Sequence, residues 1–157
     1  MNSRNLIDID QKLNTFDMKP QQHQSKGLNI TIWILQFLLA AMYLMAGFMK
    51  LSQPIDKLAE SLPWAAEVSE GLVRFIGASE LLGALGLLLP SLLRIKPKLT
   101  VFAAIGLALV QLFAIVFHVS RGETSVIGMN FILFLIAVFI AWGRAKKVPI
   151  TPKHKLA

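Results

Sequence analysis

One acidic residue, Glu80, lies inside an apolar stretch, residues 74–90, that is long enough to cross a membrane. Placing a charged group in hydrocarbon costs about 2.5–3.5 kcal/mol on insertion scales, so an acid there is a functional-site hypothesis by default. Small residues share its helical face, with Gly77 three positions before it, Gly83 three after and Ala84 four after. Because small residues let helices approach closely, we expect Glu80 to face other helices and not lipid.

Two roles are open for Glu80. It is either hydrogen-bonding glue between helices, an interaction that averages about 0.6 kcal/mol in membranes, or a group that handles a proton or pairs with a cation. The cation would come from Lys50 or Arg74, which lie about two helical turns nearer the same membrane surface.

Three other apolar stretches each carry one hydrogen-bonding side chain at a similar depth. Counting five to seven residues inward from the outer end of each predicted helix reaches four polar side chains: Tyr43, Glu80, Gln111 and Asn130. We predict that they form a buried polar layer, which is a candidate ligand-binding site. At 1.5 Å of rise per residue, this layer lies about 8–11 Å below the interface. Above it we predict an outer ionisable ring: Lys50, Arg74, His118 and Arg121. Structural alternatives stay open, with Gln111 as glue, Tyr43 as a packing residue and His118 as an interfacial residue.

Several kinds of chemistry are excluded or poorly supported. The chain has no cysteine, which excludes disulfides, thiol nucleophiles and Cys-ligated zinc or iron–sulfur sites. Glu80 and His118 together supply two ligands, too few for a catalytic zinc. No glycine loop of the phosphate-binding type is present. We therefore predict no metal site and no catalytic residue, and a non-enzymatic role is favoured.

Composition indicates a membrane protein. Of 157 residues, 55% are hydrophobic and 16% are charged, compared with about 25% charged in average soluble domains. The net charge is +7 and the mean hydropathy is +0.60. The positive charges lie at the ends of apolar blocks, which favours topology and lipid-headgroup contact and argues against nucleic-acid binding.

The pattern predicts an all-α fold, an integral membrane four-helix bundle. The expected spans are 30–50, 72–89 closed by Pro90, 99–118 and 125–142, inside a membrane domain of residues 28–144. Residues 1–27 are expected to be a polar flexible tail, and residues 145–157 a basic tail. The outer loop between the first two spans is predicted to hold a short amphipathic helix started by Pro54.

The first span carries a stripe of polar or small residues that should face the bundle. Its members recur every three or four positions: Gln36, Ala40, Tyr43, Gly47 and Lys50. Orientation follows from lysine and arginine counts, with twelve on the side of the termini and the 90–98 loop and four on the other. Because cytoplasmic sides carry the excess, we expect both termini of this inner-membrane protein to be cytoplasmic.

Sequence motifs in these spans resemble the DoxX-like family of small membrane proteins. The matching pieces are residues 46–51, residues 74–90, and His118 to Glu123 followed by Asn130 and the closing Gly143-Arg144. The resemblance covers residues 30 to 144 and implies a four-helix membrane bundle. The family name comes from a subunit linked with quinone-dependent thiosulfate oxidation, and related bundles act as assembly or trafficking factors. By position in these motifs, the resemblance implies five candidate functional residues: Lys50, Arg74, Glu80, His118 and Asn130.

Three functions are compatible with a small membrane bundle that contains a buried polar layer. The favoured one is a non-catalytic membrane subunit or accessory factor that binds a partner protein or a lipophilic molecule, such as a quinone, between its helices. The alternative is a quinone-linked oxidoreductase component in which Glu80 and His118 handle protons. The third is a small-molecule transporter. The sequence shows no discontinuous helix and no inverted repeat, which argues against this function. Expected partners are the lipid bilayer, a membrane protein or a second copy of the chain, and no nucleic acid.

Overall fold

Helices form nearly all of the computed structural model, which describes residues 25–153. The four long helices are α2 (Lys26–Ser52), α4 (Glu70–Leu93), α5 (Lys98–Ser120) and α6 (Thr124–Trp142). Shorter elements are α3 (Ile55–Ser61), the 3₁₀ turn η1 (Pro63–Ala66) and the π-helical turn η2 (Gly143–Lys147). No strand occurs in the described range. The tail predicted for residues 1–27 lies, as far as residue 24, outside the described residues.

All four long helices are long and apolar enough to cross a membrane. The spans contain 23 to 27 residues, with the fourth running through α6 and η2 to Lys147. At about 1.5 Å per residue, each span exceeds the roughly 30 Å hydrocarbon layer. The predicted all-α membrane bundle with four spans is therefore confirmed, and the protein is a multi-pass membrane protein.

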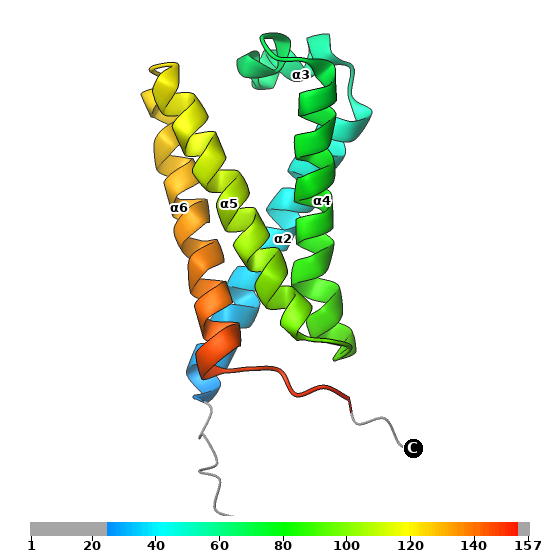
Figure 1. The fold of residues 1–157 in the computed structure, drawn as a ribbon, viewed down its shortest axis with the longest axis vertical. Coiled ribbons are helices and arrows are strands. Elements are labelled where there is room, and N and C mark those ends of the chain that lie inside the picture. Colours follow the sequence, from blue (N-terminus) through cyan, green and yellow to red (C-terminus); the bar gives the residue numbers. More distant parts are fainter. Residues whose placement is uncertain (1–24, 154–157) are drawn as a thin grey trace, which may run out of the picture.

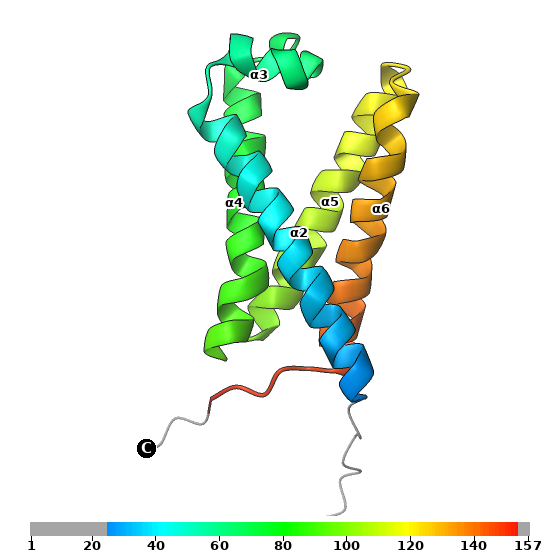
Figure 2. The same cartoon turned by 180° about the vertical axis from the view of Figure 1, so that it is seen from behind.

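The long helices are arranged as two pairs (Figure 1). Helix α2 packs along α4 and helix α5 along α6, and residues 94–97 connect the pairs. We call the end that carries α3, η1 and the α5–α6 turn the α3 end, and the opposite end the α4–α5 end. The pairs lie close together at the α4–α5 end and diverge toward the α3 end, as both views show (Figures 1 and 2).

The distribution of buried apolar residues explains this divergence. The main core joins all four long helices and includes Ile32, Leu87, Leu107 and Ile140. In α6 the buried residues lie in its last two turns, near the α4–α5 end. The α3 end has a smaller cluster, formed by Leu58, Ala65 and Val73 with partly buried neighbours. The attraction between packed helices increases with the number of apolar atoms in contact. The pairs therefore separate where the shared core ends.

Helix α4 corrects one prediction, because it does not close at Pro90. The helix continues to Leu93 and ends at Arg94, whose φ of 56° is left-handed. Proline lacks the N–H that would bond the carbonyl one turn earlier. Membrane helices tolerate this loss because neighbouring groups and local adjustments satisfy the freed carbonyl.

The bundle-facing stripe of the first span is confirmed. All five predicted residues are buried: Gln36, Ala40, Tyr43, Gly47 and Lys50. The segment after residue 144, expected to be a basic tail, packs across the α4–α5 end. Val148 is buried in the main core, and the Lys153 backbone N–H donates to the Arg94 carbonyl at 3.0 Å.

Candidate functional site

A buried ion pair joins α2 to α4. The Lys50 Nζ atom lies 2.7 Å from Glu80 Oε2, and the two side chains are only 8% and 9% exposed. Glycines create this approach, since a Cβ added to Gly77 would lie 2.7 Å from the Lys50 Cβ and one added to Gly47 would lie 2.7 Å from the Gly77 carbonyl oxygen. Glu80 therefore faces a helix and not lipid, as its small-residue face predicted.

The stability of such a buried ion pair depends on the presence of both residues. Removing two charges from water is costly, and their attraction in a low-dielectric interior offsets that cost only while both are present. Breaking a buried pair by removing one partner typically costs about 3–5 kcal/mol. The Lys50–Glu80 pair is thus an ionic group that the fold keeps inside the membrane domain.

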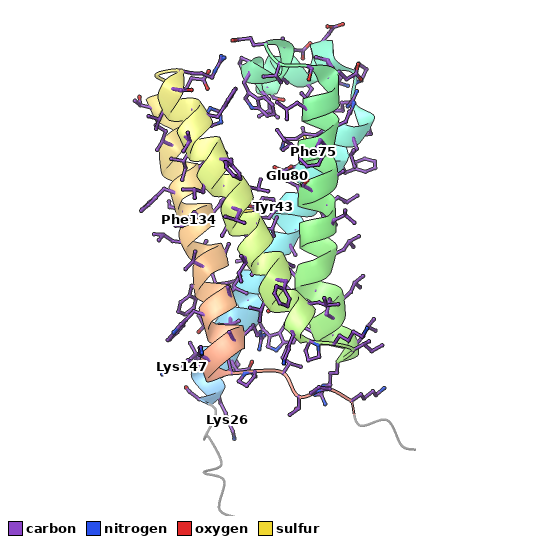
Figure 3. The ribbon with its side chains drawn as sticks, viewed as in Figure 1. Lys26, Tyr43, Phe75, Glu80, Phe134 and Lys147 are labelled. Atoms are coloured by element: carbon purple, nitrogen blue, oxygen red, sulfur yellow. The ribbon has the colours of Figure 1, made fainter. Side chains whose placement is uncertain are left out.

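A second polar contact joins the two helix pairs. Gln111 Nε2 on α5 donates to the Tyr43 hydroxyl oxygen on α2 at 2.7 Å, and both residues are buried. Figure 3 shows the Tyr43 and Glu80 side chains near one another, on the side of α2 and α4 that faces α5. The Tyr43 hydroxyl therefore lies near the Lys50–Glu80 ion pair at the line where the pairs separate, and we call these three side chains the polar group.

The predicted buried layer is not one hydrogen-bonded network. Tyr43 and Gln111 bond each other, whereas Glu80 bonds Lys50. Asn130 on α6 is half-buried, and its Nδ2 atom has no partner among the described residues. The four residues thus divide into a bonded pair, an ion-paired acid and a separate amide.

Arg74 has a structural partner set. It donates to the backbone carbonyls of Lys50 and Gln53 and, at 2.8 Å, to Glu70 one turn earlier in α4. The last carbonyls of a helix lack intrahelical partners and attract cations. Arg74 therefore caps the C-terminal end of α2 and fixes the position of Lys50.

The other two members of the predicted outer ring gather on the α5–α6 turn. His118 Nδ1 lies 2.6 Å from Glu123 Oε2, and Arg121 Nε donates to Glu123 Oε1 at 2.7 Å. Arg121 also pairs with Glu67, next to η1, at 2.6 Å. The ring residues consequently form two groups, Lys50 with Arg74 on one helix pair and His118 with Arg121 on the other.

The Arg121–Glu67 ion pair joins the two helix pairs at the α3 end, and we call it the latch. Trp64 of η1 also packs edge-on against Phe117 of α5, with ring centroids 6.1 Å apart. The hydrogen bond from Arg121 lowers the pKa of Glu67 below its usual value, and hydrogen bonds from His118 and Arg121 do the same for Glu123. Both carboxylates are therefore ionised, as the latch requires, at neutral pH.

A further polar cluster, centred on Arg144, was missed by sequence reasoning. Arg144 is 4% exposed, and its Nε donates to Gln36 Oε1 at 3.0 Å. The sequence indicated Arg144 only as a positive charge and as part of the closing Gly143-Arg144 piece of the family resemblance, with no partner assigned to it. A second signal was Gln36, a buried amide in an apolar helix that needed a partner. Across residues 25–153, no group of three His, Cys, Asp or Glu residues could hold a metal ion.

A family comparison matches the DoxX-like family over residues 34–140, more than half of the chain. The chain belongs to the DoxX-like family. It matches no curated protein and no solved structure. In this DoxX-like protein the matched segment contains the Lys50–Glu80 pair and Tyr43, and it ends before Arg144. The polar group at the line of separation therefore lies within the family segment, and the Arg144 cluster lies partly beyond it.

Proposed function

We propose that this DoxX-like protein is a non-catalytic membrane subunit or accessory factor that binds a lipophilic molecule by its polar head group. The binding region is the line where the α2–α4 pair separates from the α5–α6 pair (Figure 1). The observation that carries the proposal is the buried polar group formed by Tyr43, Glu80 and Lys50 at that line.

The chemistry of this group fits a head with carbonyl or hydroxyl oxygens. Lys50 supplies an ammonium donor, Glu80 a carboxylate acceptor, and Tyr43 a hydroxyl that both donates and accepts. Polar groups at this depth are costly unless they are satisfied, so a head group that replaces an existing partner must offer equivalent bonds. A quinone ring, with two carbonyls on an apolar body, is the candidate ligand.

Entry of the head group requires the Tyr43–Gln111 hydrogen bond to open, because that bond is the polar link between α2 and α5. An incoming carbonyl would accept from Tyr43, and Gln111 would be released. The Arg121–Glu67 latch and the Trp64–Phe117 contact link the two helix pairs at the α3 end of the same region. Binding would therefore be accompanied by a change in the separation of the two helix pairs.

A second function, a quinone-linked oxidoreductase component, is favoured by one observation, the buried acid Glu80. Its proposed proton partner His118 bonds Glu123 on its own side of the molecule. Among the described residues, no hydrogen bond joins His118 to Glu80. This arrangement supports binding over proton transfer between the two residues.

The proposal includes an orientation, with the α4–α5 end facing the cytoplasm. Twelve of the chain's sixteen lysines and arginines lie in the two terminal segments and the 90–98 loop. Cytoplasmic loops carry such an excess.

The binding proposal is tested by extracting lipids from protein purified in mild detergent and analysing them by mass spectrometry. We expect a lipophilic molecule, with a quinone as the first candidate, to co-purify with the unmodified protein and to be lost from Tyr43→Phe. The phenylalanine keeps the ring and removes the hydroxyl, so packing is preserved. Ser79→Ala is the matched control, because Ser79 bonds only the Phe75 carbonyl of its own helix.

The same experiment separates the candidate functions. Co-purified quinone that undergoes reduction and reoxidation in the membrane would favour the oxidoreductase component. Identical extracts from the unmodified protein and Tyr43→Phe would contradict binding at this line.

A further inference from the structure

The α4–α5 end holds a buried guanidinium with unused donors. Arg144 donates from Nε to Gln36 and from Nη1 to Asn29 Oδ1 at 2.8 Å and to the Val148 carbonyl at 3.3 Å. Its central carbon lies over the Trp33 ring, 4.7 Å from the ring centroid, in a cation–π contact. Its Nη2 atom is buried and has no hydrogen-bond partner among the described residues. A guanidinium has five N–H donors, so the two on Nη2 remain for a ligand.

Within residues 25–153, this buried cation has no carboxylate partner to balance its charge. Its partners are two side-chain amides and a backbone carbonyl, and no salt bridge to Arg144 occurs among the described residues. Each acid in residues 25–153 belongs to α3, the α3 end or the Glu80 pair. A buried charge without a counter-charge is strongly unfavourable, so this part of the protein is suited to binding an anion.

Two cavities adjoin at Arg144. The first, of about 140 Å³, lies between α2, α4 and the C-terminal segment, and its lining includes Arg94, Arg144, Ser91 and Asn29. The second, of about 600 Å³, runs along the start of α5, and its lining is mainly apolar, including Leu99, Val101, Phe102, Ile150 and Pro152. Arg144 and Ile150 line both cavities. Among the described residues, no acidic side chain lines either cavity, and Lys96 and Lys98 line the second.

We infer that this end of the molecule is a specific binding site for an anionic phospholipid. The phosphate lies in the first cavity and accepts from Nη2 of Arg144 and from Arg94, and an acyl chain lies in the apolar groove along α5. A planar guanidinium suits phosphate oxygens, and lysines beside it add charge attraction. Basic pockets between membrane helices are suited to anionic head groups.

The groove favours a lipid over free phosphate. Free phosphate would fill the first cavity and leave the larger apolar one unoccupied. Phe102 and Leu99 at the groove are 66% and 49% exposed on a membrane-spanning helix, so hydrocarbon surrounds them. A phospholipid satisfies the cation and the apolar surface together.

The test is a titration of the full chain, in nonionic detergent, with dioleoyl phosphatidylglycerol, dioleoyl phosphatidylcholine or inorganic phosphate. Native mass spectrometry measures lipid binding, and the melting temperature measures stabilisation. We expect phosphatidylglycerol to bind about 25-fold more tightly than phosphatidylcholine, since the Arg144 and Arg94 contacts each contribute roughly a fivefold preference. Inorganic phosphate should give no comparable stabilisation.

Three variants locate the site. Arg144→Gln should abolish the preference for phosphatidylglycerol. Arg94→Asn, in which asparagine tolerates the left-handed backbone, should reduce it about fivefold without disturbing the core. Lys57→Gln, at an exposed position of α3, removes the same charge at the opposite end and should leave the preference unchanged.

Four outcomes would overturn the inference. These are equal binding of the two lipids, equal stabilisation by inorganic phosphate, the same loss in Lys57→Gln as in Arg94→Asn, and a full preference retained by folded Arg144→Gln. If Arg144→Gln does not fold, Arg94→Asn decides the question alone.

Discussion

Replacing Glu80 by glutamine should destabilise the protein, because it leaves the Lys50 ammonium buried without its counter-charge. The two side chains are 8% and 9% exposed, so water cannot replace the lost partner. Breaking a buried pair on one side costs about 3–5 kcal/mol. For a chain of this size that corresponds to a melting temperature lower by roughly 6–20 °C. Lys50→Met should lower the stability by a similar amount, since it leaves the Glu80 carboxylate buried without its counter-charge.

The double variant Lys50→Met/Glu80→Leu separates the charge effect from packing. Apolar residues of similar volume often replace a buried ion pair with no loss, or with a gain of about 1–4 kcal/mol. We therefore expect the double variant to melt within a few degrees of the unmodified protein while it loses the co-purified lipophilic molecule. Stability without binding would assign the pair to ligand recognition.

Thermal unfolding in detergent, followed by circular dichroism, measures Lys50→Met, Glu80→Leu and the double variant that combines them against Ser79→Ala. The reasoning predicts a strong coupling, with the double variant far more stable than the sum of the single effects allows. Additive losses would refute it, because they would mean that Lys50 and Glu80 contribute independently. Retained binding in a stable double variant would refute the role of the pair in recognition.

Three further predictions concern packing, topology and pH. Gly77→Leu should lower the melting temperature, because its Cβ would meet α2, whereas Gly71→Leu, with nothing within 4 Å, should not. Cysteines at Ser61 and Ile95, both exposed, should label from opposite membrane sides, Ser61 from outside; labelling from one side would contradict four spans. The Glu67 pKa is lowered from 4.5 by its arginine partner, so the contact stabilises fully above that pH and is lost as pH falls through the lowered pKa. The difference in melting temperature between the unmodified protein and Glu67→Gln should therefore be constant down to about pH 5 and shrink only below it.

The spans and the faces of their helices could be predicted from sequence because both depend on local patterns. Apolar length sets the number of spans, and periodicity identifies the buried face, as with the stripe that contains Tyr43 and Lys50. Burial of Glu80 followed from the small residues around it. Each of these inferences uses residues within one helix.

The partners of the polar residues could not be predicted in the same way. Lys50 and Arg74 were both open as the cation for Glu80, and the close α2–α4 crossing at Gly47 and Gly77 is what selects Lys50. The Arg144 cluster depends on how the end of α6 meets the start of α2, which no local pattern encodes. Contacts between helices are decided by three-dimensional packing, where many crossings are compatible with the same buried faces.

The divergence of the two helix pairs has a consequence for the surrounding bilayer. The two helix pairs stand further apart at the α3 end than at the α4–α5 end (Figures 1 and 2), an arrangement that would displace more lipid in the leaflet at the α3 end. A wedge of this kind relieves packing stress where the wider leaflet is stretched, as on the convex side of a curved membrane. Closing the pairs around a bound molecule would reduce that area difference, and lateral pressure in the leaflet would then favour the closed form.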